Sequence, residues 1–145
     1  MERAELDPRR FVVLSVARSW LGTPWKHAQV ARGIGVDCAM FLCSVYYQAG
    51  LVPWIDPRPY PPDWFLHRDE ERMLNIVKRY AHPVVEPLPG DIALYQWGRC
   101  VSHVAIVVDD ELVIHAFLQA ESVTYTERDA LADRLAKPHS YWSAF

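Results

Sequence analysis

Three side chains in this sequence could together cleave an acyl bond: those of Cys38, His103 and His115. A nucleophilic cysteine needs a base, and an imidazole suits that task. His103 stands at the start of an apolar run, Val104–Val108, which has the pattern of a strand and would hold the ring on a rigid element. His115 lies in a second such run and could orient the ring of His103 if the two strands are neighbours. The three residues therefore predict thiol chemistry.

The residues around Cys38 predict that it begins a buried helix. Asp37 is suited to cap a helix that runs from Cys38 to about Ala49, where Gly50 would end it. This segment is apolar on nearly every side, as is typical of a helix inside a domain. Unpaired N–H groups at a helix start favour a thiolate. We therefore expect Cys38 to have a low pKa.

The loop between the two histidine-bearing strands decides whether the imidazoles can meet. A two-residue loop at Asp109–Asp110 would send His103 and His115 to opposite faces of the sheet, because side chains alternate along a strand. A three-residue loop would place both on one face, directly opposite or one diagonal apart. We therefore predict an odd-length loop, or a bulge, and both side chains on the face that packs toward Cys38.

Zinc binding is the main alternative for the cysteines. Cys38, Cys43, Cys100 and His103 are zinc-type ligands. Five helical steps between Cys38 and Cys43, however, turn the two thiols apart by about 140°. We therefore expect no metal and no organic cofactor, and we interpret Cys43 as a small buried apolar residue.

The rest of the chain reads as helices followed by strands. Helices are predicted over Asp7–Leu21 and Asp69–Tyr80, a loop over Thr23–Val36, and a stiff extended segment over Pro53–Pro62. Further along the chain, strands are predicted at Ile92–Trp97, Ser102–Val108, Glu111–Phe117 and Ser122–Thr126, then a helix at Arg128–Leu135 and a strand closing an edge at Tyr141–Phe145. This order indicates an α+β fold, with helices packed on an antiparallel sheet and residues 1–145 forming a single domain.

Composition narrows the classes of function. The 145 residues carry 15 basic and 18 acidic side chains, for a net charge of −3, so no basic face is expected for nucleic acid. No apolar stretch approaches the length of a membrane span and the N-terminus has no signal-peptide pattern. We expect synthesis in the cytoplasm and no membrane insertion.

Four blocks of the sequence, in order and spacing, resemble the NlpC-type cysteine peptidases, papain-like cell-wall hydrolases of bacteria and phages. The blocks are Gly35-Val36-Asp37-Cys38-Ala39, Leu88-Pro89-Gly90-Asp91-Ile92-Ala93-Leu94, Ser102-His103-Val104-Ala105-Ile106-Val107 and Val113-Ile114-His115-Ala116. The resemblance implies a papain-like fold with Cys38 as nucleophile, His103 as base and His115 as the third polar residue. It implies cleavage of peptide bonds in peptidoglycan stems, commonly the bond between D-γ-glutamate and a diamino acid.

The sequence departs from the family pattern at two places. Ala39-Met40 stands where the family usually has Ser-Gly, and Trp25 stands where it often has a tyrosine that helps to stabilise the oxyanion. Trp25, through its indole N–H, and Asp37 are therefore our candidates for contacts with substrate or oxyanion.

The segments Tyr60-Pro61-Pro62-Asp63-Trp64 and Leu66–Arg72 resemble an insert of phage tail-associated members. This likeness implies other tail-tip proteins as partners, incorporation into a phage tail, and action at genome entry or tail assembly. Two alternatives stay open: a catalytically weak or inactive structural tail-tip adaptor, and a cysteine acyltransferase.

Overall fold

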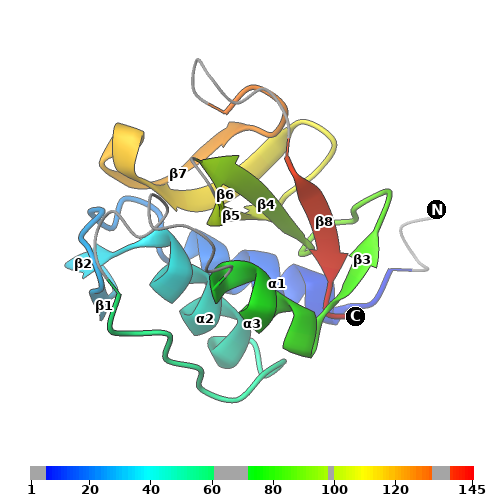
Figure 1. Cartoon of the computed structure of the whole chain (residues 1–145), viewed down its shortest axis with the longest axis horizontal. Coiled ribbons are helices and arrows are strands. Elements are labelled where there is room, and N and C mark those ends of the chain that lie inside the picture. The colour runs from blue at the N-terminus through cyan, green and yellow to red at the C-terminus, as the bar shows by residue number, and fades with distance from the viewer. Residues whose placement is uncertain (1–5, 61–71, 98–99, 132–137) are drawn as a thin grey trace.

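The computed structural model describes residues 6–60, 72–97, 100–131 and 138–145. Within these ranges the helices are α1 (Arg9–Arg18), α2 (Cys38–Gln48) and α3 (Arg72–Tyr80). Figure 1 shows the helices gathered on one side of the main sheet. Among the described residues, no helix has the length and apolar character that crossing a bilayer requires.

The main sheet has six strands, and every neighbouring pair is antiparallel. Its order is β3-β8-β4-β5-β6-β7, so the four central strands of the chain form the predicted meander. The strands are β3 (His82–Val84), β4 (Ile92–Trp97), β5 (Cys100–Val107), β6 (Leu112–Phe117), β7 (Ser122–Glu127) and β8 (Ser140–Ser143). The α+β fold, with helices packed on an antiparallel sheet, is confirmed.

The C-terminal strand was wrongly expected at an edge. β8 lies inside the sheet between β4 and β3, and β3 forms the edge. The sequence gives little sign of β3, because three residues are too few to show alternation and one of them is Pro83. Proline is tolerated there because an edge strand pairs on one side only.

Two other segments differ from their predictions. The expected loop Thr23–Val36 contains a small hairpin of β1 (Val30–Ala31) and β2 (Gly35–Val36), whose two-residue strands are too short to show periodicity. The expected helix Arg128–Leu135 does not begin where predicted. Residues 128–129 form a turn, and Arg128 N–H donates to Glu111 O, in the loop before β6, at 2.7 Å. Positions 132–137, like residues 61–71 with the start of the predicted helix Asp69–Tyr80, lie outside the described residues.

The two faces of the main sheet bury different apolar clusters. Val104 and Ile106 of β5 join α1 and α2 in the larger cluster, which also includes fully buried Met40 and Phe41. The alternate residues of β5 face a smaller cluster on the other side, made of Ala93, Tyr95, Ala105, Val107, Val113, Phe117 and Leu131. Helix α2 is thus enclosed, as its all-round apolar sequence predicts.

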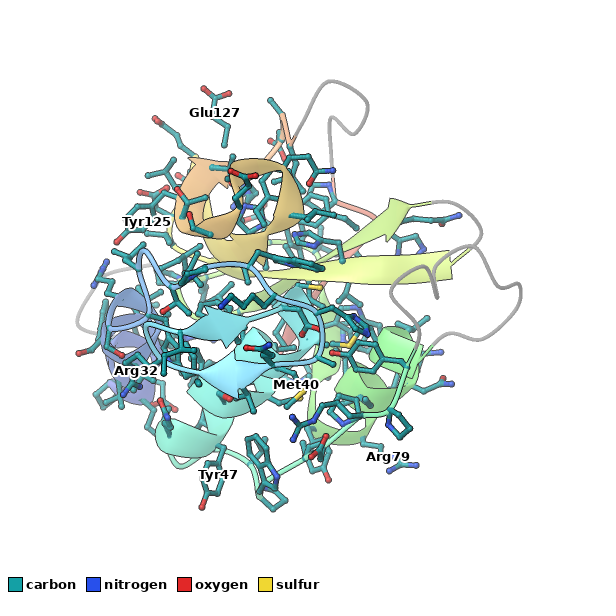
Figure 2. The ribbon with its side chains drawn as sticks, turned by 90° about the vertical axis from the view of Figure 1, so that its left-hand side faces the viewer. Arg32, Met40, Tyr47, Arg79, Tyr125 and Glu127 are labelled. Atoms are coloured by element: carbon teal, nitrogen blue, oxygen red, sulfur yellow. The ribbon has the colours of Figure 1, made fainter. Side chains whose placement is uncertain are left out.

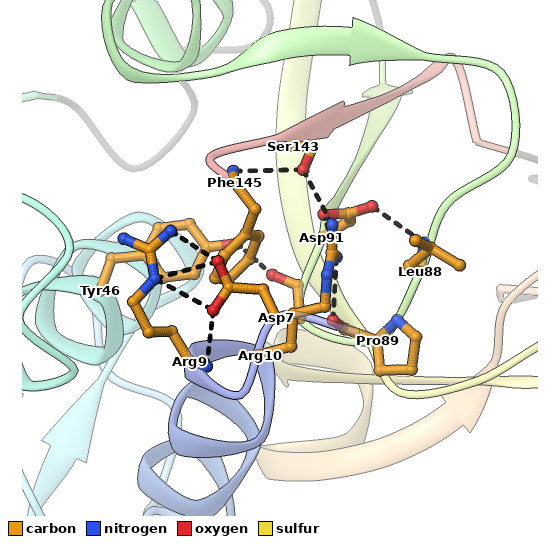
Figure 3. A network of polar contacts seen from close by, with 10 residues as sticks. Asp7, Arg9, Arg10, Tyr46, Leu88, Pro89, Asp91, Ser143 and Phe145 are labelled. Atoms are coloured by element: carbon orange, nitrogen blue, oxygen red, sulfur yellow. Dashed lines mark hydrogen bonds and ion pairs between the residues drawn. The ribbon is translucent and has the colours of Figure 1, made fainter. Parts of the chain in front are cut away.

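A buried ion pair joins the first helix to the sheet (Figure 3). The Arg10 guanidinium donates to Asp91 Oδ1 at 2.7 Å and to Pro89 O at 3.1 Å, and the two charged side chains are 8% and 1% exposed. Asp91 Oδ2 accepts from Leu88 N–H. Arg10 also lies 4.4 Å from the ring centroid of Phe145. The Leu-Pro-Gly-Asp block is therefore part of the structural connection between α1, the start of β4 and the C-terminal strand.

Candidate active site

Cys38 is the first residue of α2, at the capped end of the helix. Asp37, in extended conformation, accepts a hydrogen bond from Met40 N–H at 3.0 Å through Oδ1, the N-cap contact that the sequence predicts. The backbone N–H groups of Cys38 and Ala39, at the start of the helix, lie near the Cys38 sulfur and act to lower its pKa. The sulfur thus lies at the positive end of the α2 dipole.

The carboxylate of Asp37 also ties two loops to this helix end. Its Oδ2 accepts from Ala28 N–H at 2.7 Å and from the Tyr60 hydroxyl at 2.5 Å, and the residue is 3% exposed. These contacts assign Asp37 to holding the helix end, while a contact with substrate stays a prediction. Sequence reasoning did not single out Tyr60, because a tyrosine in a proline-rich segment gives no sign of which carboxylate it will reach.

A three-residue loop joins β5 to β6, as predicted. Ile106 pairs with Ile114 and Val107 with Val113, so facing residue numbers add to 220 and Asp109–Glu111 remain as the loop. Asp109 shapes this loop, because its Oδ1 accepts from the backbone N–H of Glu111 and Leu112, each at 2.8 Å.

This register brings the two imidazoles together, one diagonal apart on the same face. His103 Nε2 and His115 Nδ1 are 2.7 Å apart, and the side chains are 3% and 0% exposed. The odd-length loop therefore has the consequence that the sequence predicts.

That face is not the one we expected. His103 and His115 lie against Tyr95 and Phe117, which belong to the smaller cluster, and the His115 ring stacks on Phe117 at 4.5 Å. The expectation that both histidines occupy the face packed on α2 is wrong, because alternation reserves that face for Val104 and its apolar partners.

Cys38 reaches β5 at its edge instead. β5 and β6 are paired only at Ile106↔Ile114 and Val107↔Val113, so the ladder between them stops before Val104. The backbone N–H of Val104, the residue after His103, lowers the pKa of Cys38 and therefore lies near its sulfur. The thiol therefore lies where the two histidine-bearing strands diverge, beside the backbone that carries His103.

Thr126 of β7 extends the chain of polar contacts. Its Oγ1 hydrogen-bonds to His115 Nε2, on the ring nitrogen opposite the one that meets His103. If His103 Nδ1 is to accept a proton, His103 Nε2–H must donate to His115 Nδ1, and His115 Nε2–H must donate to Thr126. Thr126 is thus the group that can fix both tautomers. Sequence reasoning did not predict Thr126 as a site residue, because the alternation of polar and apolar residues in β7 does not distinguish it from other threonines in strands.

Burial keeps the reacting groups neutral in the unliganded protein. Loss of hydration, followed by the negative charge of Asp37, raises the pKa of Cys38 to about 12, although the three N–H groups around its sulfur oppose this shift. Burial lowers the pKa of His103 to about 3 and that of His115 well below its ordinary value. The expected low pKa of Cys38 is therefore wrong, because the enclosed position outweighs the helix end.

The remaining candidates lie apart from the hydrogen-bonded chain. Trp25 pairs with Val36, two residues before Cys38, and its half-buried ring packs against the larger cluster. Its contribution to oxyanion binding stays a prediction. Cys43 is 4% exposed, as expected of a buried apolar residue. Among the described residues, no group of three or more histidine, cysteine or acidic side chains is arranged to hold a metal.

Comparison with known proteins identifies one family. The NlpC/P60 family matches residues 22–138. The NlpC/p60 domain of the peptidoglycan hydrolase SagA is similar in structure, with a TM-score of 0.61 and 22% identity over 92% of this chain and 97% of that domain. None of the curated proteins matches the sequence.

Two further structures share the fold within longer chains. An NlpC/P60 family protein from Bacillus cereus has a TM-score of 0.64 and 20% identity, covering 91% of this chain and 39% of that one. The peptidoglycan hydrolase RipB from Mycobacterium tuberculosis has a TM-score of 0.59 and 18% identity, covering 99% of this chain and 67% of that one. The chain thus spans well under half of the Bacillus cereus protein.

Proposed function

Because this chain belongs to the NlpC/P60 family, we propose that it is a cysteine peptidase that hydrolyses peptide bonds in the stem peptides of peptidoglycan. One observation carries the proposal. The backbone N–H of Val104, directly after His103, lowers the pKa of Cys38, and His103 Nε2 lies 2.7 Å from His115 Nδ1. The thiol therefore lies beside the strand that carries the proposed base, and that base contacts the proposed orienting group.

The neutral resting state determines the order of proton transfers. As the sulfur attacks the amide carbonyl carbon, its proton passes to His103 Nδ1, and the resulting imidazolium is stabilised through His115. The tetrahedral intermediate collapses, the C–N bond breaks, and His103 gives its proton to the leaving amine. Water then attacks the thioester, loses a proton to His103, and releases the acid while the sulfur regains a proton.

The start of α2 is the natural binding site for the oxyanion. The N–H groups of Cys38 and Ala39 point at the sulfur in the resting enzyme, next to the carbon that the sulfur would attack. These N–H groups can donate hydrogen bonds to the oxyanion when the C–S bond forms. Ala39 keeps its backbone donor although the family usually has serine there, so this part of the mechanism survives the departure.

Digestion of purified peptidoglycan tests the proposal. Wild type should release fragments with new stem-peptide ends, identified by mass spectrometry, and Cys38→Ala should release none. His103→Gln is the better base variant, because removing a ring packed between Tyr95 and Phe117 by alanine would also open a cavity. Fragments that persist in Cys38→Ala would overturn the proposal.

The bond between D-γ-glutamate and the diamino acid is the proposed target, and the same fragments identify it. Cleavage elsewhere in the stem would refute this assignment while leaving the peptidase assignment intact. Adding a free amine separates hydrolysis from acyl transfer, because a transferase would place that amine on the new acyl end.

We further propose that the protein acts as part of a phage tail, with tail-tip proteins as partners. The support is the resemblance of the segments beginning at Tyr60, of which the structure describes Tyr60 and its bond to Asp37. Finding the protein in purified virions by mass spectrometry would test this role.

A structural adaptor is the alternative that the raised pKa of Cys38 favours. An adaptor would leave peptidoglycan uncut in the same digestion, yet would be retained in the virion. The two measurements together therefore distinguish an enzyme from an adaptor.

A further inference from the structure

An open groove of about 550 Å³ lies beside the C-terminal half of α2, outside the Cys38 site. This volume is in the range of small-ligand sites, roughly 300–1,000 Å³. Figure 2 looks onto this side of the molecule, with Arg32 near the β1–β2 hairpin and Tyr47 below it. The groove is lined by Trp20, Val30, Arg32, Ser44, Tyr47, Gln48 and Trp54.

One wall of the groove is an exposed aromatic pair. Tyr47 and Trp54 meet edge to face, with centroids 5.5 Å apart and planes at 71°. They are 49% and 43% exposed, which is high for side chains of this size. The edge-to-face contact holds each ring in place while its outer surface stays available to an apolar surface of a ligand.

Other residues of the lining are polar and are held by their own contacts. Gln48 Oε1 accepts from Arg32 Nη2 at 2.5 Å and from Trp20 Nε1 at 3.3 Å. The Arg32 guanidinium lies 4.9 Å from the Trp20 ring. With the Gln48 oxygen engaged, its amide N–H₂ group and the remaining Arg32 N–H groups are donors at the groove, and no acceptor for the Gln48 amide occurs among the described residues.

A buried hydroxyl completes the lining. Ser44 is 2% exposed, and its Oγ has no hydrogen-bond partner among the described residues. A buried polar group without a partner is costly, on the order of 1–3 kcal/mol, and a native protein seldom keeps one without reason. Ser44 lies beneath the groove surface, because its Oγ is closed off from solvent, so the ligand contacts come from the exposed side chains around it.

We propose that this groove binds a saccharide, the glycan strand of the cell wall. Sugar rings present C–H groups on their faces, which pack on aromatic rings, and hydroxyl and acetamido groups around their edges. The groove offers both kinds of contact, because exposed aromatic rings line it together with amide and guanidinium N–H groups. The choice of a cell-wall glycan rests on the proposed function, since the stem peptide is attached to such a strand.

The groove is separate from the candidate active site. Cys38 begins α2 and Tyr47 lies nine residues further along the same helix, a rise of about 13 Å and a rotation of about half a turn, so the two side chains leave the helix on opposite sides.

The test uses chitotetraose, a peptide-free oligomer of N-acetylglucosamine, titrated into the full chain by calorimetry. Wild type should bind it, and Trp54→Ala and Tyr47→Ala should each weaken binding by about fivefold or more. Tyr125→Ala removes an aromatic ring of similar exposure from β7 and should leave the affinity unchanged.

Three outcomes would overturn the saccharide site: no binding at millimolar sugar, equal affinity in wild type and Trp54→Ala, or binding of a free peptide in the groove in place of the sugar. Because chitotetraose has no peptide bond, its binding is independent of cleavage. Sugar binding without peptidoglycan digestion would refute the peptidase and keep the groove, and the reverse result would refute the groove alone.

Discussion

His103 Nε2 contacts His115 Nδ1 at 2.7 Å across two strands that have already diverged. This contact leaves Nδ1 as the nitrogen of His103 that can take a proton from the thiol. It also requires His115 to accept a hydrogen bond at Nδ1 and to donate one at Nε2. The polar contacts therefore form a chain with a direction, from His103 through His115 to Thr126.

The first prediction concerns the acceptor at position 115. His115→Asn and His115→Gln keep an oxygen that can accept from His103 and should retain part of the activity. His115→Leu offers no acceptor and should lower kcat about 100-fold or more, in the range of general base catalysis. Rates of peptidoglycan digestion measure the difference, and equal rates for the leucine and asparagine variants would show that His115 does not orient His103.

Thr126 supports the same tautomers from the far end. Thr126→Val keeps the shape of the side chain but removes the oxygen that accepts from His115, so kcat should fall about threefold to tenfold, the worth of one hydrogen bond. Thr126→Ser keeps the oxygen and should restore the rate. If serine and valine behave alike, packing and not the hydroxyl is what matters at this position.

The pH dependence of Cys38 alkylation reports its pKa. With the pKa raised to about 12, the thiolate fraction below pH 9 should grow tenfold for each pH unit, so the iodoacetamide rate should climb without a plateau. Cys38 should still react before Cys43, because the Cys38 side chain is half-buried and Cys43 is buried. A plateau between pH 5 and 8 would instead indicate a preformed thiolate and imidazolium pair.

Asp37→Asn tests the charge beside the thiol. The carboxylate raises the pKa of Cys38, so its removal should lower that pKa and speed alkylation at a fixed pH of about 8. Asparagine is also a good N-cap, so the helix should stay folded, and circular dichroism checks this. Asp56→Asn removes an exposed carboxylate that does not shift the Cys38 pKa and serves as the control. Unchanged alkylation in Asp37→Asn would contradict the electrostatic effect.

The Arg10–Asp91 pair predicts a large effect on stability. Asp91→Ala leaves the Arg10 charge buried without its partner and should lower the free energy of unfolding by about 3–5 kcal/mol. The matched control is Asp7→Ala, which breaks an exposed pair with Arg9 and should cost much less. Urea denaturation measures both, and equal losses would show that the buried pair contributes no more than a surface one.

Apolar runs between turn residues made the central sheet predictable from sequence. β4 was predicted with its observed bounds, and β5 to β7 within two residues. β3 and the β1–β2 hairpin were missed, since strands of two or three residues show no period. The position of β8 depends on long-range pairing with β3 and β4, which local sequence does not contain.

The sequence predicted those features of the candidate site that depend on loop length and on helix capping. It did not predict the features that depend on contacts between residues far apart in the chain. The three-residue loop and the Asp37 cap follow from local rules. The bond from Tyr60 to Asp37 joins residues 23 positions apart, and the acidity of Cys38 depends on how deeply α2 is enclosed. Both follow from tertiary packing alone.

The inner position of β8 affects how the chain folds during its synthesis. β8 is translated after the other strands, yet it fills the slot between β3 and β4, and Ser143 within it contacts Arg10, 133 residues earlier. β3 and β4 therefore have unpaired edges until β8 has been synthesised and pairs with them. Such long-range pairing is slow, and the unpaired edges are prone to aggregation. Completion of the sheet therefore follows the synthesis of its other strands, β3 to β7.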